Sequence, residues 1–117
     1  MSDTFIYHNP RCSKSRQTLE LLQQRGIEPT VVLYLEQPPS KKTLKELLQK
    51  LGIAARDLLR RGEDEYKTLG LGDDSLSDEQ LIAAMHEHPK LIERPIVVRG
   101  AQARLGRPPE AVLKLFD

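Results

Sequence analysis

The chain has 117 residues, 38% of them hydrophobic and 30% charged, which is typical of one soluble globular domain. Lys and Arg (18) balance Asp and Glu (17), and the net charge of +1 indicates neither a nucleic-acid-binding protein nor one drawn to anionic membranes. No apolar run approaches the roughly 20 residues of a membrane-spanning helix, and the first residues lack the features of a secretion signal. We therefore expect a single domain over residues 1–117, with no nucleic acid or membrane partner.

The chain contains one cysteine, Cys12. A lone cysteine cannot form an internal disulfide, and it fits a reducing compartment better than a disulfide-bonded secreted framework. The sequence thus predicts a cytoplasmic protein and makes the role of this thiol the central functional question.

The first third of the chain predicts a β-α-β unit. Residues 5–8 form a short β-prone run that ends at the turn signal Asn9-Pro10, directly before Cys12. Residues 13–25 have leucines at helical spacing and end at Gly26. Residues 30–35 are continuously apolar and β-branched, which predicts a strand buried on both faces.

The middle of the chain is predicted to be helical. Ser40 is the expected N-cap of an amphipathic helix that ends at Gly52, and a short helix is expected over residues 54–61. Ser77 begins a Ser-x-x-Gln capping box for another helix, with Pro89 marking its end.

The last third predicts a hairpin and a final helix. Residues 96–98 form an apolar strand, Arg99-Gly100 a turn and residues 103–105 a weaker strand. Prolines 108 and 109 then open a helix with apolar residues for the core.

The expected element order is β-α-β, then a helical insert over about residues 40–90, then β-β-α. This order predicts an α/β fold with a thioredoxin-like mixed sheet flanked by helices. The first β-α-β unit should be parallel with a right-handed crossover. That connection places the loop carrying Cys12 at the carboxyl end of the sheet, the edge where ligands usually bind.

Cys12 lies where unpaired backbone N–H groups and the helix dipole favour a negative sulfur. Arg11, Lys14 and Arg16 add positive charge nearby. A thiol pKa is ordinarily near ~8.5, and such surroundings lower it, so a nucleophilic thiolate is predicted. The alternative is an inert buried cysteine acting as a small hydrophobe, which the loop position and polar neighbours disfavour.

Ser15 follows Cys12 by three residues, giving Cys-x-x-Ser, so an external thiol must regenerate the cysteine. Ser15 could donate a hydrogen bond to the thiolate or be an ordinary first-turn helix residue. His8 could tune the thiolate or simply end the strand. The sequence leaves both alternatives open.

Four segments together resemble the ArsC-type, glutaredoxin-linked arsenate reductases, and the resemblance covers nearly the whole chain. They are Tyr7-His8-Asn9-Pro10-Arg11-Cys12-Ser13-Lys14-Ser15-Arg16, Leu33-Tyr34-Leu35-Glu36, Glu93-Arg94-Pro95-Ile96-Val97-Val98 and Gly106-Arg107-Pro108.

The resemblance implies specific roles for residues of this chain. Cys12 matches the catalytic nucleophile, Ser15 the serine near it and His8 an auxiliary histidine. The oxyanion-binding arginines match Arg60, Arg94 and Arg107. The resemblance also implies a thioredoxin-like fold with a helical insert and a cis proline at Pro95.

Arginine suits the predicted substrate because a thiolate attacking anionic arsenate meets like-charge repulsion. A guanidinium stays charged and can hold two oxygens at once, which also orients the anion. Arg60 has an alternative role as a cation near a helix C-terminus, which Arg61 could fill equally well.

The resulting hypothesis is that the Cys12 thiolate reduces arsenate to arsenite. The resemblance implies glutathione as co-substrate and glutaredoxin as the partner that resolves the mixed disulfide. We expect neither a bound cofactor nor a metal ion. We also expect the protein to be a monomer. One alternative is a glutathione-linked thiol transferase or a reductase of another oxyanion. Another is a non-enzymatic regulator that contacts RNA polymerase, although that branch typically carries Cys-x-x-Cys.

Overall fold

The computed structural model describes residues 4–116 of the chain. The chain divides into two compact units, one made of the segments up to Gln37 and from Arg94 onward, the other of Pro38–Glu93. The second unit contains the region predicted as a helical insert. The prediction that the whole chain is one domain stays a prediction.

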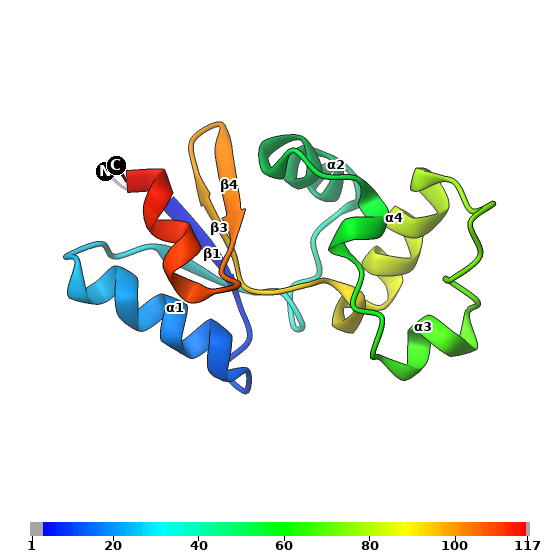
Figure 1. The fold of residues 1–117 in the computed structure, drawn as a ribbon, viewed down its shortest axis with the longest axis horizontal. Coiled ribbons are helices and arrows are strands. Elements are labelled where there is room, and N and C mark those ends of the chain that lie inside the picture. Colours follow the sequence, from blue (N-terminus) through cyan, green and yellow to red (C-terminus); the bar gives the residue numbers. More distant parts are fainter. Residues whose placement is uncertain (1–3, 117) are drawn as a thin grey trace. The chain divides into compact units, whose positions relative to one another are not determined.

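The first unit contains a four-stranded mixed sheet (Figure 1). Its strands are β1 (Thr4–His8), β2 (Thr30–Leu33), β3 (Ile96–Arg99) and β4 (Gln102–Leu105), in the spatial order β2-β1-β3-β4. The β1 strand pairs parallel with β2 and antiparallel with β3, and β3 pairs antiparallel with β4 as a hairpin. The predicted mixed, thioredoxin-like sheet is confirmed.

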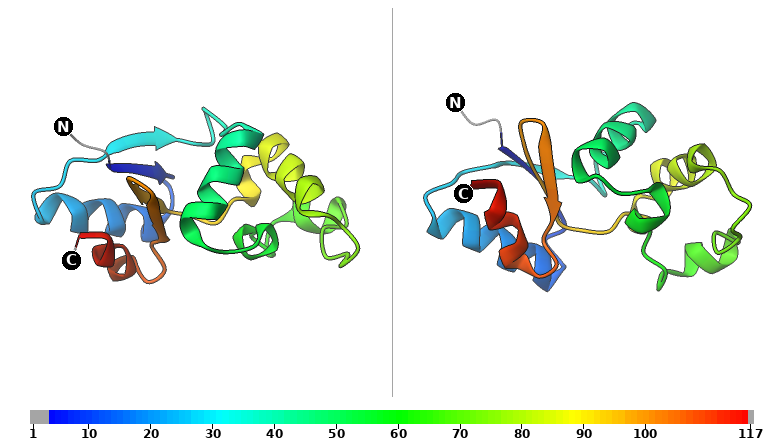
Figure 2. Two further views of the ribbon diagram at one scale, coloured as in Figure 1. Left: turned by 90° about the horizontal axis from the view of Figure 1, so that it is seen from above. Right: turned by 45° about the horizontal axis from the view of Figure 1, so that its top comes forward.

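Two helical segments pack against this sheet. The helix α1 (Ser13–Gln24) and the 3-10 segment η3 (Pro109–Phe116) lie side by side (Figures 1 and 2). The core beneath them joins the central strands to both segments, through the buried side chains of Ile6, Leu22, Val97, Val112 and Leu115. This packing anchors the start of α1, where Cys12 lies.

The prediction for β2 is wrong in two respects. The strand ends at Leu33 rather than at residue 35, and it is not buried on both faces, since Val31 is 42% exposed. The cause is its position, because β2 is an edge strand of the unit's sheet and pairs on one side only. An apolar run alone does not distinguish an edge strand from a central one.

The second unit is helical. It contains α2 (Lys41–Leu51), η1 (Ala55–Leu58), α3 (Asp64–Thr68), α4 (Asp78–Glu87) and η2 (Pro89–Leu91). The predicted caps are confirmed, since the Ser40 hydroxyl accepts a hydrogen bond from Thr43 N and Ser77 forms a capping box with Gln80. Gly52 ends α2, as predicted, and its backbone is left-handed.

The helices predicted over residues 54–61 and at the C-terminus differ from the structure. Only residues 55–58 are helical, as one 3-10 turn, because Leu59 is extended and forms an antiparallel β-bridge with Ile92. The backbone N–H of Arg60 donates to Leu91 O at 2.8 Å, so pairing with a distant segment replaces the helical bonds. The C-terminal segment is helical but of the 3-10 type.

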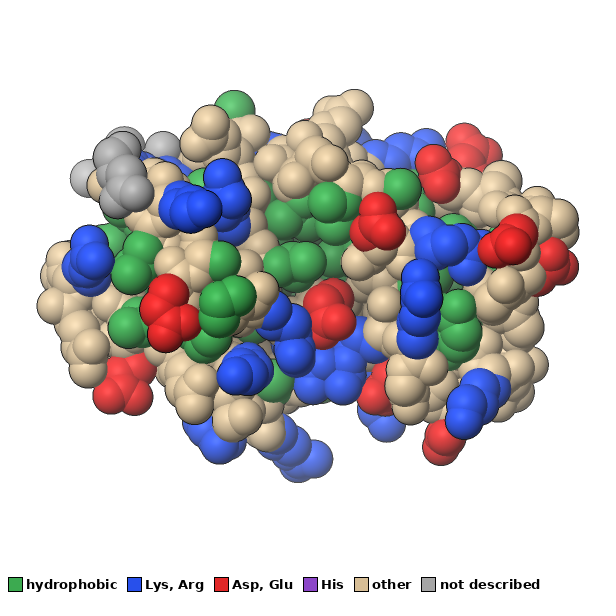
Figure 3. Space-filling model, in the orientation of Figure 1, with side chains coloured by type: hydrophobic (Ala, Val, Ile, Leu, Met, Phe, Trp, Pro, Cys, Tyr) green, Lys and Arg blue, Asp and Glu red, His purple; other side chains and the backbone are tan. Residues whose placement is uncertain are grey.

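Charged side chains of both signs are interspersed on the face drawn in Figure 3, in keeping with the balanced composition. Among the helices of residues 4–116, none is both long and apolar enough to cross a bilayer.

Gly106 lies where no side chain fits. A Cβ at this position would lie 2.5 Å from Thr18 Oγ1 on α1 and 2.7 Å from Cγ of the rigid Pro95 ring. We expect Gly106→Ala to lower the free energy of unfolding by about 1–3 kcal/mol, the usual cost of overpacking. Urea unfolding measures this, with Gly62→Ala as the matched control because nothing lies within 4 Å of its added Cβ. Equal stability of the two variants would contradict the prediction.

Candidate active site

Cys12 is the N-cap residue of α1. Its backbone is extended (φ −95°, ψ 122°), its N–H donates to Asn9 O at 3.0 Å, and its carbonyl accepts the first helical hydrogen bond from Arg16 N at 3.0 Å. The residue is buried, with 8% of its surface exposed. The sulfur therefore stands beside the free N–H groups of the helix start, as the sequence predicted.

The loop before Cys12 is held by its own polar groups. Asn9 Oδ1 accepts a hydrogen bond from Arg11 N at 3.0 Å, and Arg16 Nη1 donates to Pro10 O at 2.9 Å. Sequence reasoning treated Asn9 only as a turn residue and missed its role in shaping the cysteine loop. The sequence signal for this role is the Asn residue itself, because an Asn side chain can form a hydrogen bond with the backbone two residues further along the chain.

His8 and Ser15 contact each other beneath the loop. His8 Nδ1 and Ser15 Oγ are 2.6 Å apart, and Asn9 N donates to the same oxygen at 3.0 Å. Burial lowers the pKa of His8, and the charge of Arg16 lowers it further, so the ring is neutral near pH 7. With the ring proton on Nε2, the Ser15 hydroxyl donates to Nδ1, which satisfies both groups. This network joins the end of β1 to the first turn of α1.

The hydroxyl of Ser15 thus bonds His8 and Asn9, whereas a hydrogen bond to the thiolate was one of the two alternatives that the sequence left open. The backbone N–H of Ser15, rather than its hydroxyl, is among the groups that lower the pKa of Cys12. A role for His8 and Ser15 in tuning the Cys12 thiolate stays a proposal. In this geometry the two residues would act by positioning the start of α1.

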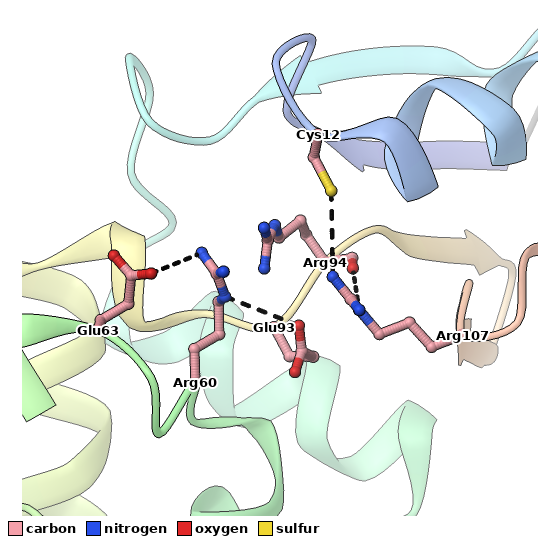
Figure 4. A network of polar contacts seen from close by, with 6 residues as sticks. All are labelled: Cys12, Arg60, Glu63, Glu93, Arg94 and Arg107. Carbon is pink, nitrogen blue, oxygen red and sulfur yellow. Dashed lines mark hydrogen bonds and ion pairs between the residues drawn. The ribbon is translucent and has the colours of Figure 1, made fainter.

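Two of the three predicted arginines lie by the sulfur (Figure 4). Arg107 Nη2 is 4.0 Å from Cys12 Sγ, and Arg107 Nε donates to the carbonyl oxygen of Arg94 at 2.9 Å. Both residues precede cis prolines, at Arg94–Pro95 as the resemblance implied and also at Arg107–Pro108, which was not predicted. Residues about 95 positions apart in sequence are therefore brought to one thiol.

These surroundings favour the thiolate. Burial raises the pKa of Cys12, but the backbone N–H groups of Ser15 and Lys14 and the charges of Arg94 and Arg107 together lower it below its ordinary value. Hydrogen bonds and positive charges that stabilise the anionic form outweigh the loss of hydration.

The pH dependence of Cys12 alkylation tests this. We expect the iodoacetamide rate to rise with a midpoint below the ordinary thiol value, because the thiolate is the reactive form. Removing a cation disfavours the anion, so Arg107→Gln should move the midpoint upward, while Arg104→Gln on the exposed side of β4 should not. A wild-type midpoint at or above the ordinary value near ~8.5 would contradict the prediction.

Arg60 belongs to the second unit. Its Nη1 lies 3.2 Å from Glu63 Oε2 and its Nε 3.9 Å from Glu93 Oε1, so two carboxylates hold the guanidinium (Figure 4). Its backbone N–H is bonded to the η2 segment. Its predicted role in oxyanion binding stays a proposal.

The site of the first unit thus combines a nucleophile with a cationic surround. A thiolate can attack an electrophilic centre, and two guanidinium groups can neutralise the oxygens of an anion held next to it. Among residues 4–116, no group of three or more His, Cys, Asp or Glu side chains is placed to hold a metal ion.

A model of the ArsC family matches residues 7–115, from the end of β1 through η3. The chain belongs to the ArsC family. The match includes every residue that the sequence placed in the site.

Individual relatives of the ArsC family are similar over almost the whole chain. The uncharacterized protein YfgD of Escherichia coli K12 is 61% identical over 94% of this chain and 93% of its own length. An arsenate reductase of Escherichia coli is 51% identical over 99% of this chain and 82% of its own length. The solved structure of the arsenate reductase from Vibrio cholerae is 60% identical, covers 95% of each chain and superposes with a TM-score of 0.93.

Proposed function

We propose that the protein is an arsenate reductase, in which the Cys12 thiolate attacks arsenate held by arginines. The observation that carries the proposal is the position of Arg107 Nη2, 4.0 Å from a sulfur whose pKa is lowered. The names of the Escherichia coli and Vibrio cholerae relatives, at 51% and 60% identity, support arsenate as the substrate.

In the proposed reaction, the Cys12 sulfur forms a bond to arsenic(V), and one arsenate oxygen leaves as water after protonation. Arg94 and Arg107 neutralise the remaining oxygens, which reduces the repulsion between the thiolate and the anion. Arg60 is the proposed third oxyanion-binding residue, carried over from the family resemblance.

The reducing electrons come from two thiols. A glutathione thiolate attacks the Cys12 sulfur of the adduct, a disulfide forms between the two sulfurs, and the S–As electron pair passes to arsenic, which leaves as arsenite. Glutaredoxin then resolves the mixed disulfide. The presence of a single cysteine in the chain supports an external thiol donor, since no second cysteine can resolve Cys12 internally.

Arsenite production by the purified protein tests this proposal. Turnover is measured with glutathione alone, with glutathione plus glutaredoxin, and with thioredoxin and its reductase, each coupled to NADPH consumption. We expect arsenite only with glutathione and the fastest turnover with glutaredoxin. Turnover supported by thioredoxin alone would contradict the proposed donor, and absence of arsenite under all three conditions would contradict arsenate reduction.

We also propose that the protein acts in the cytoplasm as a monomer. The lone, thiolate-prone cysteine supports a reducing compartment. Light scattering of the purified protein measures its mass, and a value near 13.3 kDa is expected.

A further inference from the structure

A pocket opens in the first unit where β1 and β2 end. Its volume is about 410 Å³, within the range of about 300–1,000 Å³ typical of small-molecule sites. It is lined by His8, Asn9, Pro10, Arg11, Leu33, Leu35 and Glu36. This is the sheet edge at which α/β folds usually bind ligands, and the anion-binding side chains of Arg94 and Arg107 do not line it.

The pocket carries two opposite charges on an apolar base. Arg11 and Glu36 are exposed, and within residues 4–116 neither side chain forms a hydrogen bond or an ion pair. Pro10, Leu33 and Leu35 supply apolar surface between them. Such a site suits a small zwitterion with a carboxylate, an ammonium group and a short aliphatic body, because each charge meets its opposite.

The pocket wall continues directly into the catalytic loop. Arg11 lines the pocket, and the next residue in the chain is Cys12. The Cα atoms of consecutive residues lie about 3.8 Å apart. An extended tripeptide spans roughly 10 Å. A tripeptide held in the pocket by its charged ends has its central residue roughly 5 Å from either end, which is comparable to the step from Arg11 to Cys12.

From this we propose that the pocket between the β1 and β2 ends is the glutathione site, with a glutathione carboxylate on Arg11 and its ammonium group on Glu36. The proposal rests on the proposed function and adds the position of the thiol donor. Arsenate and glutathione thus contact different residues, and the two substrates should be separable by mutation.

Exchange of Cys12 with oxidised glutathione tests the pocket without arsenate. The Cys12 thiolate attacks one sulfur of the disulfide, a Cys12–glutathione disulfide forms, and one glutathione thiolate leaves. The rate is compared with that of a neutral disulfide, bis(2-hydroxyethyl) disulfide, which shares the chemistry but lacks the charged ends. Mass spectrometry follows both adducts.

We expect Arg11→Gln and Glu36→Gln each to slow the glutathione reaction by roughly two- to fivefold, as for the loss of an exposed ion pair. Neither residue is among the groups that lower the pKa of Cys12 in the structure, so the rate with the neutral disulfide should not change. Arg25→Gln, at the far end of α1, is the matched charge control and should change neither rate. Equal slowing with both disulfides would show that the variants act through the pKa of Cys12, and it would overturn the proposal. Unchanged rates with oxidised glutathione would overturn it as well. A protein that shows the selective effect but yields no arsenite would overturn arsenate reduction alone.

Discussion

Replacement of Cys12 by serine is expected to abolish arsenate-dependent turnover, leaving only the background reaction of glutathione with arsenate. A serine hydroxyl is not ionised near neutral pH and cannot form the mixed disulfide that the proposed cycle requires. Coupled NADPH consumption and direct detection of arsenite measure the loss.

Folding of the Cys12→Ser variant serves as its control. Cys12 bonds its neighbours through the backbone, with its N–H on Asn9 O and its carbonyl on Arg16 N, and these bonds survive the substitution. The urea midpoint should therefore stay close to that of wild type. Residual arsenate turnover in a folded variant would show that another group is the nucleophile.

Arg107→Ala is expected to lower kcat/KM for arsenate by about 10²–10³-fold, comparable to the loss of one donor from an oxyanion-binding site. The variant removes the guanidinium 4.0 Å from the sulfur and its bond to the Arg94 carbonyl. Steady-state kinetics at saturating glutathione measure the change.

Two further variants separate charge from geometry. Arg107→Lys keeps the positive charge but cannot hold two oxygens in a planar fork, so it should restore only part of the activity. Arg104→Ala removes an exposed arginine of β4 and should leave kcat/KM unchanged. Full activity in Arg107→Lys would show that charge alone suffices, and full activity in Arg107→Ala would exclude Arg107 from oxyanion binding.

Features that depend on neighbouring residues could be predicted from the amino-acid sequence. The caps at Ser40 and Ser77, the helix end at Gly52 and the position of Cys12 before α1 are confirmed, because each depends on hydrogen bonds within one turn of the chain. The order of these elements also determined the mixed, thioredoxin-like sheet.

Features that join distant segments could not be predicted, because they depend on contacts that form only in the folded chain. The edge position of β2 depends on which strands pair, and the extended backbone at Leu59 depends on its bridge to Ile92. No local sequence pattern predicts either of these two contacts.

The same reason applies to the candidate site. The sequence identified Cys12 as a thiolate candidate from its place at a helix start, whereas Arg107 reaches it only through the folded chain. The contact of Gly106 with Thr18 and the bond of Ser15 to His8 likewise depend on packing. Local hydrogen bonding is thus readable from the sequence, and the convergence of charges on one sulfur is a property of the fold.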